Sequence, residues 1–256
     1  MKHIFTLAVA AVCAACHLSA AEFNYKRLDE LKTAGDYTKL EAGASEMKSA
    51  AKLDGQKYAV IHYITFARQK LGRYADTAAV LADVEALGKE LGLTAKDDAV
   101  QAAKLFALYD RGENAYAIEL SAGWTGPKTL HRRGLNLASL KRFAEATDAY
   151  AAAAAAGSRG SWVSAAKTAI HAKLPAKCYE YALAAFANGA VRDPASGITL
   201  VNAVIDADYS GTAITSAKVK ELLQTVNRKY SRKLVVGSPS KWDELIQLVR
   251  QTLETY

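Results

Sequence analysis

Hydrophobic and small residues recur along most of the chain at spacings of three and four positions. Four segments share one arrangement, in which an aromatic residue is followed by a small or apolar residue three positions later and by another four positions after that. These segments begin at Tyr37, Tyr74, Phe143 and Tyr179. Because such spacings place side chains on one face of a helix, each segment predicts an amphipathic helix.

A turn is expected directly before each of these aromatic residues, and another helical stretch precedes each turn. The expected turns are at 34–36, 71–73, 140–142 and 176–178. The repeating unit is therefore a helix, a tight turn and a second helix. Such a pair cannot bury its apolar face alone, so the pattern predicts that neighbouring pairs stack on one another.

The four aromatic residues follow a regular spacing along the sequence. They are separated by 37, 69 and 36 positions. Since 69 is close to two periods, a degenerate copy is expected between the second and third segments. Residues 111–117 lie there, with Asn114 in the place of the aromatic residue.

The segment 129–157 resembles the tetratricopeptide repeat. Its matches to that family's pattern are Gly134, Leu137, Leu140, Phe143, Ala146, Tyr150 and Ala153. It departs from the pattern at Leu130, where tryptophan is usual, at Arg133, where an apolar residue is usual, and in lacking a closing proline. The resemblance extends over about residues 25–190 and implies an all-α fold, an α-solenoid of stacked antiparallel helix pairs. An alanine-rich helical bundle is the alternative.

Composition agrees with helices throughout. The 256 residues include 52 alanines and 4 prolines, and 51% of them are hydrophobic. Alanine is the strongest helix former, so an all-β fold is excluded. The expected organisation is a signal peptide at 1–21, tetratricopeptide-like repeats at 22–190 and a helical C-terminal cap at 191–256, whose last helix carries Trp242, Ile246, Val249 and Leu253 on one face.

The amino terminus has the features of an export signal. A basic start at 1–3 is followed by an apolar stretch at 4–16, and Ser19 and Ala21 supply the small residues that signal cleavage requires. We expect cleavage near Ala21, before Glu22, and a secreted or periplasmic protein. No later apolar run reaches the roughly 20 residues that span a bilayer, so we expect no membrane span in the mature chain.

Two other interpretations concern the same segment. Cys13, Cys16 and His17 have the spacing of a haem c attachment site, which would make the protein an exported electron carrier. Lipidation at Cys16 would instead make it a lipid-anchored assembly factor of the outer membrane. Cleavage near Ala21 removes all three residues and leaves Cys178 as the single cysteine, which we expect to be a packed thiol.

No catalytic or cofactor-binding pattern stands out in the sequence. The three histidines after the signal, His62, His131 and His171, are too far apart for a helical zinc motif, and neither a nucleophile elbow nor a phosphate-binding glycine loop occurs. We therefore expect no enzyme activity, no metal and no cofactor. The formal charge of +7 falls to +6 when Lys2 leaves with the signal, and an exported protein is not expected to bind nucleic acid.

The resemblance also indicates where a partner would bind. In tetratricopeptide repeats the first helix of each pair lines the concave side. In this chain that position implies a peptide-binding face made of Lys128, His131, Arg132, Lys167 and His171. A clamp for a terminal carboxylate is not expected, because Phe66 and Ala103 replace its asparagines. We expect an exported, non-catalytic scaffold with a mildly basic groove for an acidic or extended peptide; an ordinary solvated face is the alternative.

Overall fold

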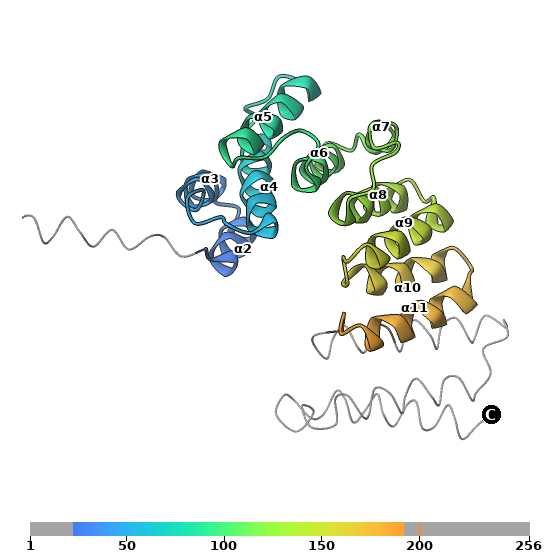
Figure 1. Ribbon diagram of the computed structural model, residues 1–256. Helices are drawn as coiled ribbons and strands as arrows, with labels where there is room; N and C mark the ends of the chain where they lie inside the picture. The colour runs from blue at the N-terminus through green and yellow to red at the C-terminus, as the bar shows by residue number, and fades with distance from the viewer. Residues whose placement is uncertain (1–22, 192–199, 201–256) are drawn as a thin grey trace, which may run out of the picture. The chain divides into compact units, whose positions relative to one another are not determined.

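The computed structural model describes residues 23–191 and residue 200. The regular structure of these residues is entirely α-helical and consists of ten helices, α2 to α11, without any strand (Figure 1). The expected signal peptide at 1–21, with Cys13, Cys16 and His17, lies outside the described residues, as do the expected capping helices beyond residue 200.

The described helices form two compact units, the first reaching to Asp110 and the second starting at Arg111. The sequence predicted one continuous repeat region at 22–190. The unit boundary lies in the turn that precedes α7, which is the degenerate copy around Asn114.

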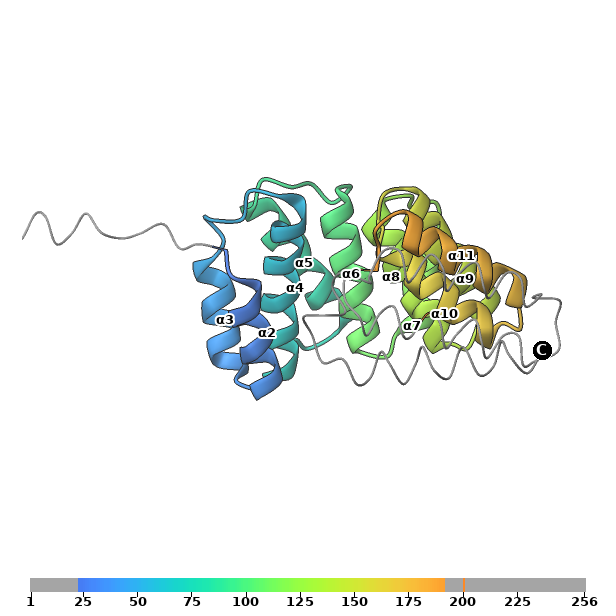
Figure 2. The ribbon, with the colours of Figure 1, turned by 90° about the horizontal axis from the view of Figure 1, so that it is seen from below.

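Each helix of the first unit packs against its neighbours in the sequence. Helix α2 packs on α3, α3 on α4, α4 on α5 and α6, and α5 on α6 (Figure 2). The bounds of these helices are α2 Tyr25–Ala34, α3 Tyr37–Glu46, α4 Asp54–Lys70, α5 Thr77–Glu90 and α6 Asp98–Asp110. Their core is one cluster of fully buried aliphatic side chains, including Leu28, Leu40, Ile61, Ile64 and Val84.

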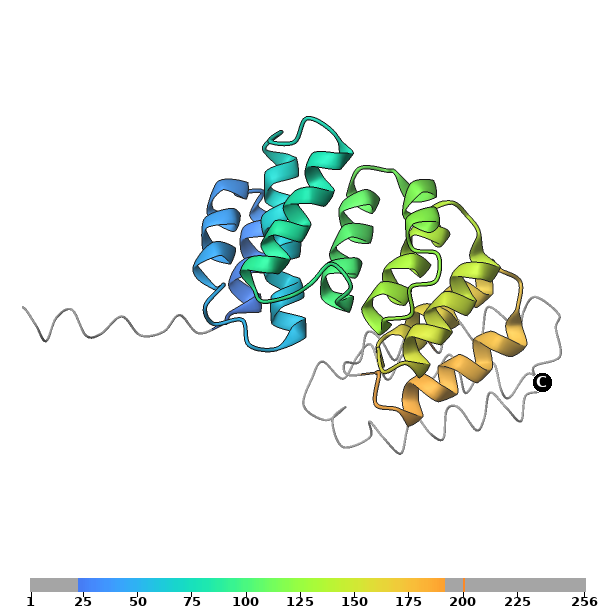
Figure 3. The same cartoon turned by 45° about the horizontal axis from the view of Figure 1, so that its top comes forward.

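The second unit continues with the same sequential packing. Helix α7 packs on α8, α8 on α9, α9 on α10 and α10 on α11 (Figure 3). The bounds are α7 Asn114–Leu120, α8 Pro127–Ser139, α9 Phe143–Ala155, α10 Ser161–His171 and α11 Pro175–Ala187. The predicted all-α fold of sequentially stacked helices is therefore confirmed for the described residues.

Three of the four predicted turns occur where the sequence placed them. Gly35 ends α2 in the left-handed region (φ 72°), and its N–H bonds to the carbonyl oxygens of Leu31 and Lys32. The turn at 71–73 contains Gly72 (φ 68°) and the turn at 140–142 contains Lys141 (φ 60°), both in the same left-handed region. Asn114 is the first residue of α7, so the degenerate copy also begins a helix as predicted.

The fourth predicted turn, at 176–178, is wrong, because these residues lie inside α11. Lys173 has the left-handed conformation (φ 57°) that ends α10, and Pro175 starts α11. Proline is favoured in the first turn of a helix, because the backbone N–H groups there have no acceptor within the helix and the missing N–H of proline costs no hydrogen bond. Tyr179 is consequently inside its helix, whereas Phe143 is the first residue of α9.

Tyr74 also differs from the predicted position. It precedes α5, which begins at Thr77 because the Asp76 side chain caps the helix by accepting a hydrogen bond from the Ala79 N–H (2.8 Å). The aromatic residues of the four segments are therefore not equivalent in the fold, although the helices that they marked are real.

A half-buried polar network joins three helices of the first unit. The Arg68 guanidinium of α4 bonds to Glu41 of α3 (2.9 Å) and to Asp83 of α5 (2.7 Å). Arg73 adds a second ion pair to Glu41 (2.7 Å), and the Tyr74 hydroxyl donates to Asp83. The network supplies hydrogen-bond partners and positive charge to the carboxylates of Glu41 and Asp83, which are largely shielded from water.

Helices α8 and α9 approach each other closely at Gly134 of α8. A Cβ atom built there would lie 2.8 Å from two ring carbons of Tyr150 in α9. This confirms the close approach that the family pattern places at Gly134. Tyr150 itself is buried, so its ring cannot move aside without disturbing the core.

We predict that Gly134→Ala destabilises the protein although alanine is the better helix former. The added methyl group overpacks the contact, and after the gain in helix propensity the free energy of unfolding falls by about 1–2 kcal/mol. The matched control is Gly43→Ala in α3, where a new Cβ would make ordinary contacts of 3.6 Å and 3.8 Å with leucine side chains.

Urea denaturation followed by circular dichroism measures both variants. The control is expected to be neutral or stabilising by up to about 1 kcal/mol. Equal effects of the two substitutions, or a Gly134→Ala variant that is more stable than the Gly43→Ala control, would contradict the close approach at Gly134.

Candidate functional site

Charges in the second unit are separated between its helices. Helices α8 and α10 carry four basic residues and no acidic one. The basic residues are Lys128, Arg132, Arg133 and Lys167. The five carboxylates between 111 and 191 all lie on other elements, and they are Glu113, Glu119, Glu145, Asp148 and Glu180.

Helical spacing aligns four of the predicted site residues on two outward-facing stripes. Lys128 and Arg132 are four positions apart on α8, and Lys167 and His171 are four positions apart on α10. The α10 pair is exposed and the α8 pair is half-buried. We call these four residues the cationic face.

The corrected turn before α11 changes which residues of α8 and α10 correspond. Counted back from the two left-handed lysines, Lys141 and Lys173, residue Lys167 corresponds to Leu135 rather than to His131. The shift is four residues, which rotates a helical position by only about 40°. Lys167 and His171 therefore lie on the predicted side of α10, although the turn at 176–178 was predicted wrongly.

His131 does not belong to the cationic face. Its Nδ1 lies 2.8 Å from the Oγ of Ser161, the first residue of α10. Its ring contacts Tyr150 edge-on, with the ring centroids 5.1 Å apart. Burial, together with the neighbouring charge of Arg132, lowers the pKa of His131 to about 4. The ring is therefore neutral at pH 7 and links α8 to α10.

Histidine and serine can act as a base and a nucleophile, but the contact between His131 and Ser161 is part of the packing of α10 on α8. Ser161 is fully buried, and its hydroxyl also bonds to the Oγ of Ser158 (2.8 Å). A hydroxyl without solvent exposure cannot receive a substrate. These three side chains hold the start of α10 against α8.

Arg133 has a role that sequence reasoning missed. Its guanidinium donates to the carbonyl oxygen of Ile118 and to the Oγ of Ser121, both at 2.9 Å. These acceptors are at the carboxyl end of α7, where positive charge is favourable and where the helix itself carries no basic residue. The sequence did contain an indication of this role, because Arg133 occupies a position that is usually apolar in the tetratricopeptide repeat.

His171 lies at the exposed end of α10. Its ring contacts Phe143 of α9, with the centroids 5.2 Å apart. This contact anchors the last turn of α10, while one edge of the imidazole remains open to solvent. His171 can thus offer a hydrogen bond next to Lys167.

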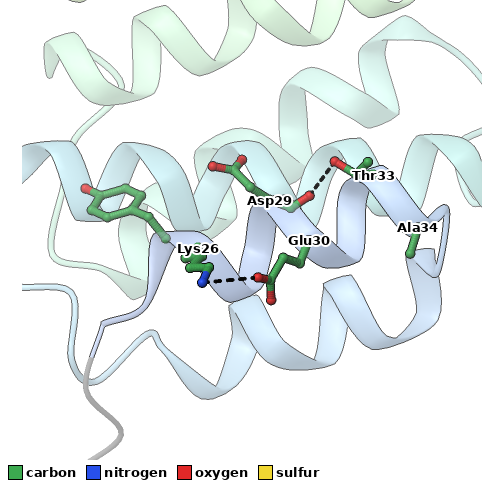
Figure 4. Close-up of a pocket in the computed structure, with 6 residues that line it drawn as sticks. Lys26, Asp29, Glu30, Thr33 and Ala34 are labelled. Carbon is green, nitrogen blue, oxygen red and sulfur yellow. Dashed lines mark hydrogen bonds and ion pairs between the residues drawn. The ribbon is translucent and has the colours of Figure 1, made fainter. Parts of the chain in front are cut away.

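A shallow hollow lies on the exposed side of α2 in the first unit (Figure 4). Six residues of that one helix line it: Tyr25, Lys26, Asp29, Glu30, Thr33 and Ala34. Two local interactions cross it, an ion pair between Lys26 and Glu30 (3.8 Å) and a hydrogen bond from the Thr33 hydroxyl to the Asp29 carbonyl oxygen (2.8 Å). These bonds are internal to the helix, so the hollow presents no convergent groups to a ligand.

Neither a metal-binding cluster nor a membrane-spanning helix occurs in the part of the chain that the structure describes. No group of three or more histidine, cysteine or acidic residues is arranged there to hold a metal ion. Within the same residues, no helix combines the length and the apolar character needed to cross a bilayer. Cys178 is fully buried in α11, as the sequence predicted.

Comparisons with known proteins add no family assignment. No protein-family model matches the chain, and no curated protein matches it significantly. What the described residues themselves establish is the helical, sequentially packed fold and the separation of charge in its second unit.

We predict that His131 makes stability pH-dependent. A histidine in the unfolded chain has a pKa near 6.5. Between pH 6.5 and 4, His131 is therefore protonated in the unfolded chain but neutral in the folded protein. Stability from this residue is therefore complete above pH 6.5 and is lost as the pH falls toward 4, by up to about 3 kcal/mol.

The control is His131→Gln, which removes the titration and keeps a side chain able to bond to Ser161. Urea denaturation at pH 7 and pH 4.5 should show a smaller loss for this variant than for the unaltered protein. Identical losses would show that His131 is not the group responsible.

Proposed function

We propose that this protein is an exported, non-catalytic binding protein of tetratricopeptide-like repeats. Its cationic face would hold an extended acidic segment of another protein. The observation that carries the proposal is the separation of charge in the second unit. Helices α8 and α10 lack carboxylates, and the acidic residues lie on α7, α9 and α11 and in the turn before α7.

Such a separation has an electrostatic consequence. Basic side chains on helices that carry no carboxylate give the surface of those helices a positive potential, which attracts an external anion. On α9 and α11 the pairing is internal: Arg142 bonds to Glu145, and Lys177 bonds to Asp148 at 2.8 Å. The first helices of the pairs are thus the favoured surface for an acidic partner.

The face also suits an extended chain rather than a small molecule. Its residues are spread over two successive helices, and both lie on elements whose positions are fixed by buried contacts with α9. An extended peptide can contact both stripes through separate side chains, as in other modes of peptide recognition by preformed helical surfaces.

We predict that reversing Lys128, Arg132 and Lys167 to Glu together abolishes this binding. The probe is a fluorescein-labelled decapeptide of alternating glutamate and glycine, measured by fluorescence anisotropy. Affinity should fall at least tenfold, which corresponds to about 1.4 kcal/mol, and it should weaken further as salt screens the charges.

The control is the triple reversal of Lys141, Arg159 and Lys173, which are exposed residues on turns and change the net charge equally. It should retain most of the affinity. Binding that survives in the first triple variant, or equal binding of a glutamine–glycine decapeptide, would contradict the proposed face.

Export is the second part of the proposal, and it rests on the pattern of residues 1–21. Cleavage near Ala21 would give a mature chain beginning at Glu22, whereas lipidation would give one beginning at Cys16. We predict that intact mass measurement of the protein recovered from outside the cytoplasm gives the mass of residues 22–256. A lipid-modified mass starting at Cys16, or retention of residues 1–21, would contradict it.

A further inference from the structure

Lys32 of α2 lies among three aromatic rings of the first unit. Its Nζ is 4.6 Å from the ring centroid of Phe66, 5.8 Å from that of Phe106 and 5.9 Å from that of Tyr63. These distances are within the range of cation–π attraction. Three helices contribute, because Tyr63 and Phe66 belong to α4 and Phe106 belongs to α6.

The rings belong to a larger half-buried aromatic surface. His62 packs edge-on against Phe106, with centroids 4.3 Å apart, and contacts Phe66 at 6.0 Å. Tyr109 continues the surface beside Phe106, at 5.7 Å. Because these rings fix one another's positions, they form a rigid apolar platform that is only partly covered.

A second ammonium group lies on the same platform. The Nζ of Lys70, the last residue of α4, is 5.3 Å from the centroid of Phe66. Both ammonium groups therefore lie within cation–π distance of the same ring. The quadrupole of a ring attracts each of them but does not remove their mutual repulsion.

Neither of these ammonium groups has an ion-pair partner among the described residues. Lys26, Lys48 and Lys104 each pair with a carboxylate. Asp29, one turn before Lys32 on α2, instead accepts a hydrogen bond from the Tyr63 hydroxyl. Aromatic rings are thus the neighbours recorded for the Lys32 and Lys70 ammonium groups, and Lys70 is also exposed to solvent.

We propose that Lys32, Lys70 and Phe66 form a binding site for a peptide segment that carries a carboxylate next to an aromatic side chain. The carboxylate would pair with the ammonium groups of Lys32 and Lys70, neither of which has an ion-pair partner among the described residues. The aromatic side chain would stack on the exposed edges of His62 and Phe106. The site is in the first unit and does not depend on the cationic face of the second.

A cationic ligand is the competing occupant, because the rings around Lys32 resemble a cage for an ammonium group. That cage is already filled by Lys32, and a further cation would meet the repulsion of Lys70 as well. Charge complementarity therefore favours the anionic ligand.

The experiment uses four synthetic hexapeptides that differ only in their two central residues: Glu-Phe, Gln-Phe, Glu-Ala and Lys-Phe, each flanked by Gly-Ser and Ser-Gly. Each is titrated to millimolar concentration into the isotopically labelled protein while backbone amide chemical shifts are recorded. The Glu-Phe peptide should give saturable shifts in α2, α4 and α6. The Gln-Phe and Glu-Ala peptides should each bind about three- to tenfold more weakly.

Variants test the two ammonium groups. Lys32→Gln and Lys70→Gln should each weaken Glu-Phe binding by about three- to tenfold. The matched control is Lys26→Gln, which removes the same charge from α2 at a residue paired with Glu30 and should leave the affinity unchanged. Circular dichroism spectra verify that all three variants keep the helical fold.

Three results would overturn the proposal. One is the absence of saturable shifts with the Glu-Phe peptide. Another is equal binding of the Gln-Phe peptide or tighter binding of the Lys-Phe peptide, which would identify the platform as apolar or as a cation cage. The third is an equal loss of affinity in the Lys26 control, which would indicate a general effect of net charge.

Discussion

The contact between Tyr150 and Gly134 is the interaction on which the second unit depends. The ring lies so close to the α8 backbone that only a residue without a Cβ fits there. The same ring touches His131, whose Nδ1 reaches Ser161 at the start of α10. One side chain of α9 thereby sets the position of both first helices that carry the cationic face. Because much of the remaining core is alanine, which buries little area, this aromatic contact carries a large share of the packing.

The two units hold their helices together by different means. In the first unit, large aliphatic side chains form the core, and the Arg68 network ties α3, α4 and α5 through half-buried ion pairs. In the second unit, the ion pairs Arg142–Glu145 and Lys177–Asp148 involve α9, α11 and the turn before α9. The basic residues of α8 and α10 lie on helices that carry no carboxylate, and this separation of charge is the physical basis of the proposed function.

Part of the candidate site followed from sequence alone and part did not. Lys128 and Arg132 share one face of α8, and Lys167 and His171 share one face of α10, because helical spacing is a local property. The error of one turn at 176–178 did not move them to another side. His131 has the same spacing, but its ring faces inward because Tyr150 and Ser161, which are distant in sequence, surround it. Spacing along one helix cannot show which neighbour covers it. The aromatic platform of the first unit was missed for the same reason, since it joins rings from three helices.

The sequence by itself determined that the chain is helical and that its helices come in pairs. Alanine content, the spacing of apolar residues and turn residues such as Gly35 act within a few positions, so they can be interpreted without a structure. The tertiary structure alone decided the division at Asp110, the burial of His131 and the meeting of Lys32 and Lys70 on Phe66. Each of these depends on side chains brought together from separate helices, and the energy of such contacts is set by distance in space rather than by position in the chain.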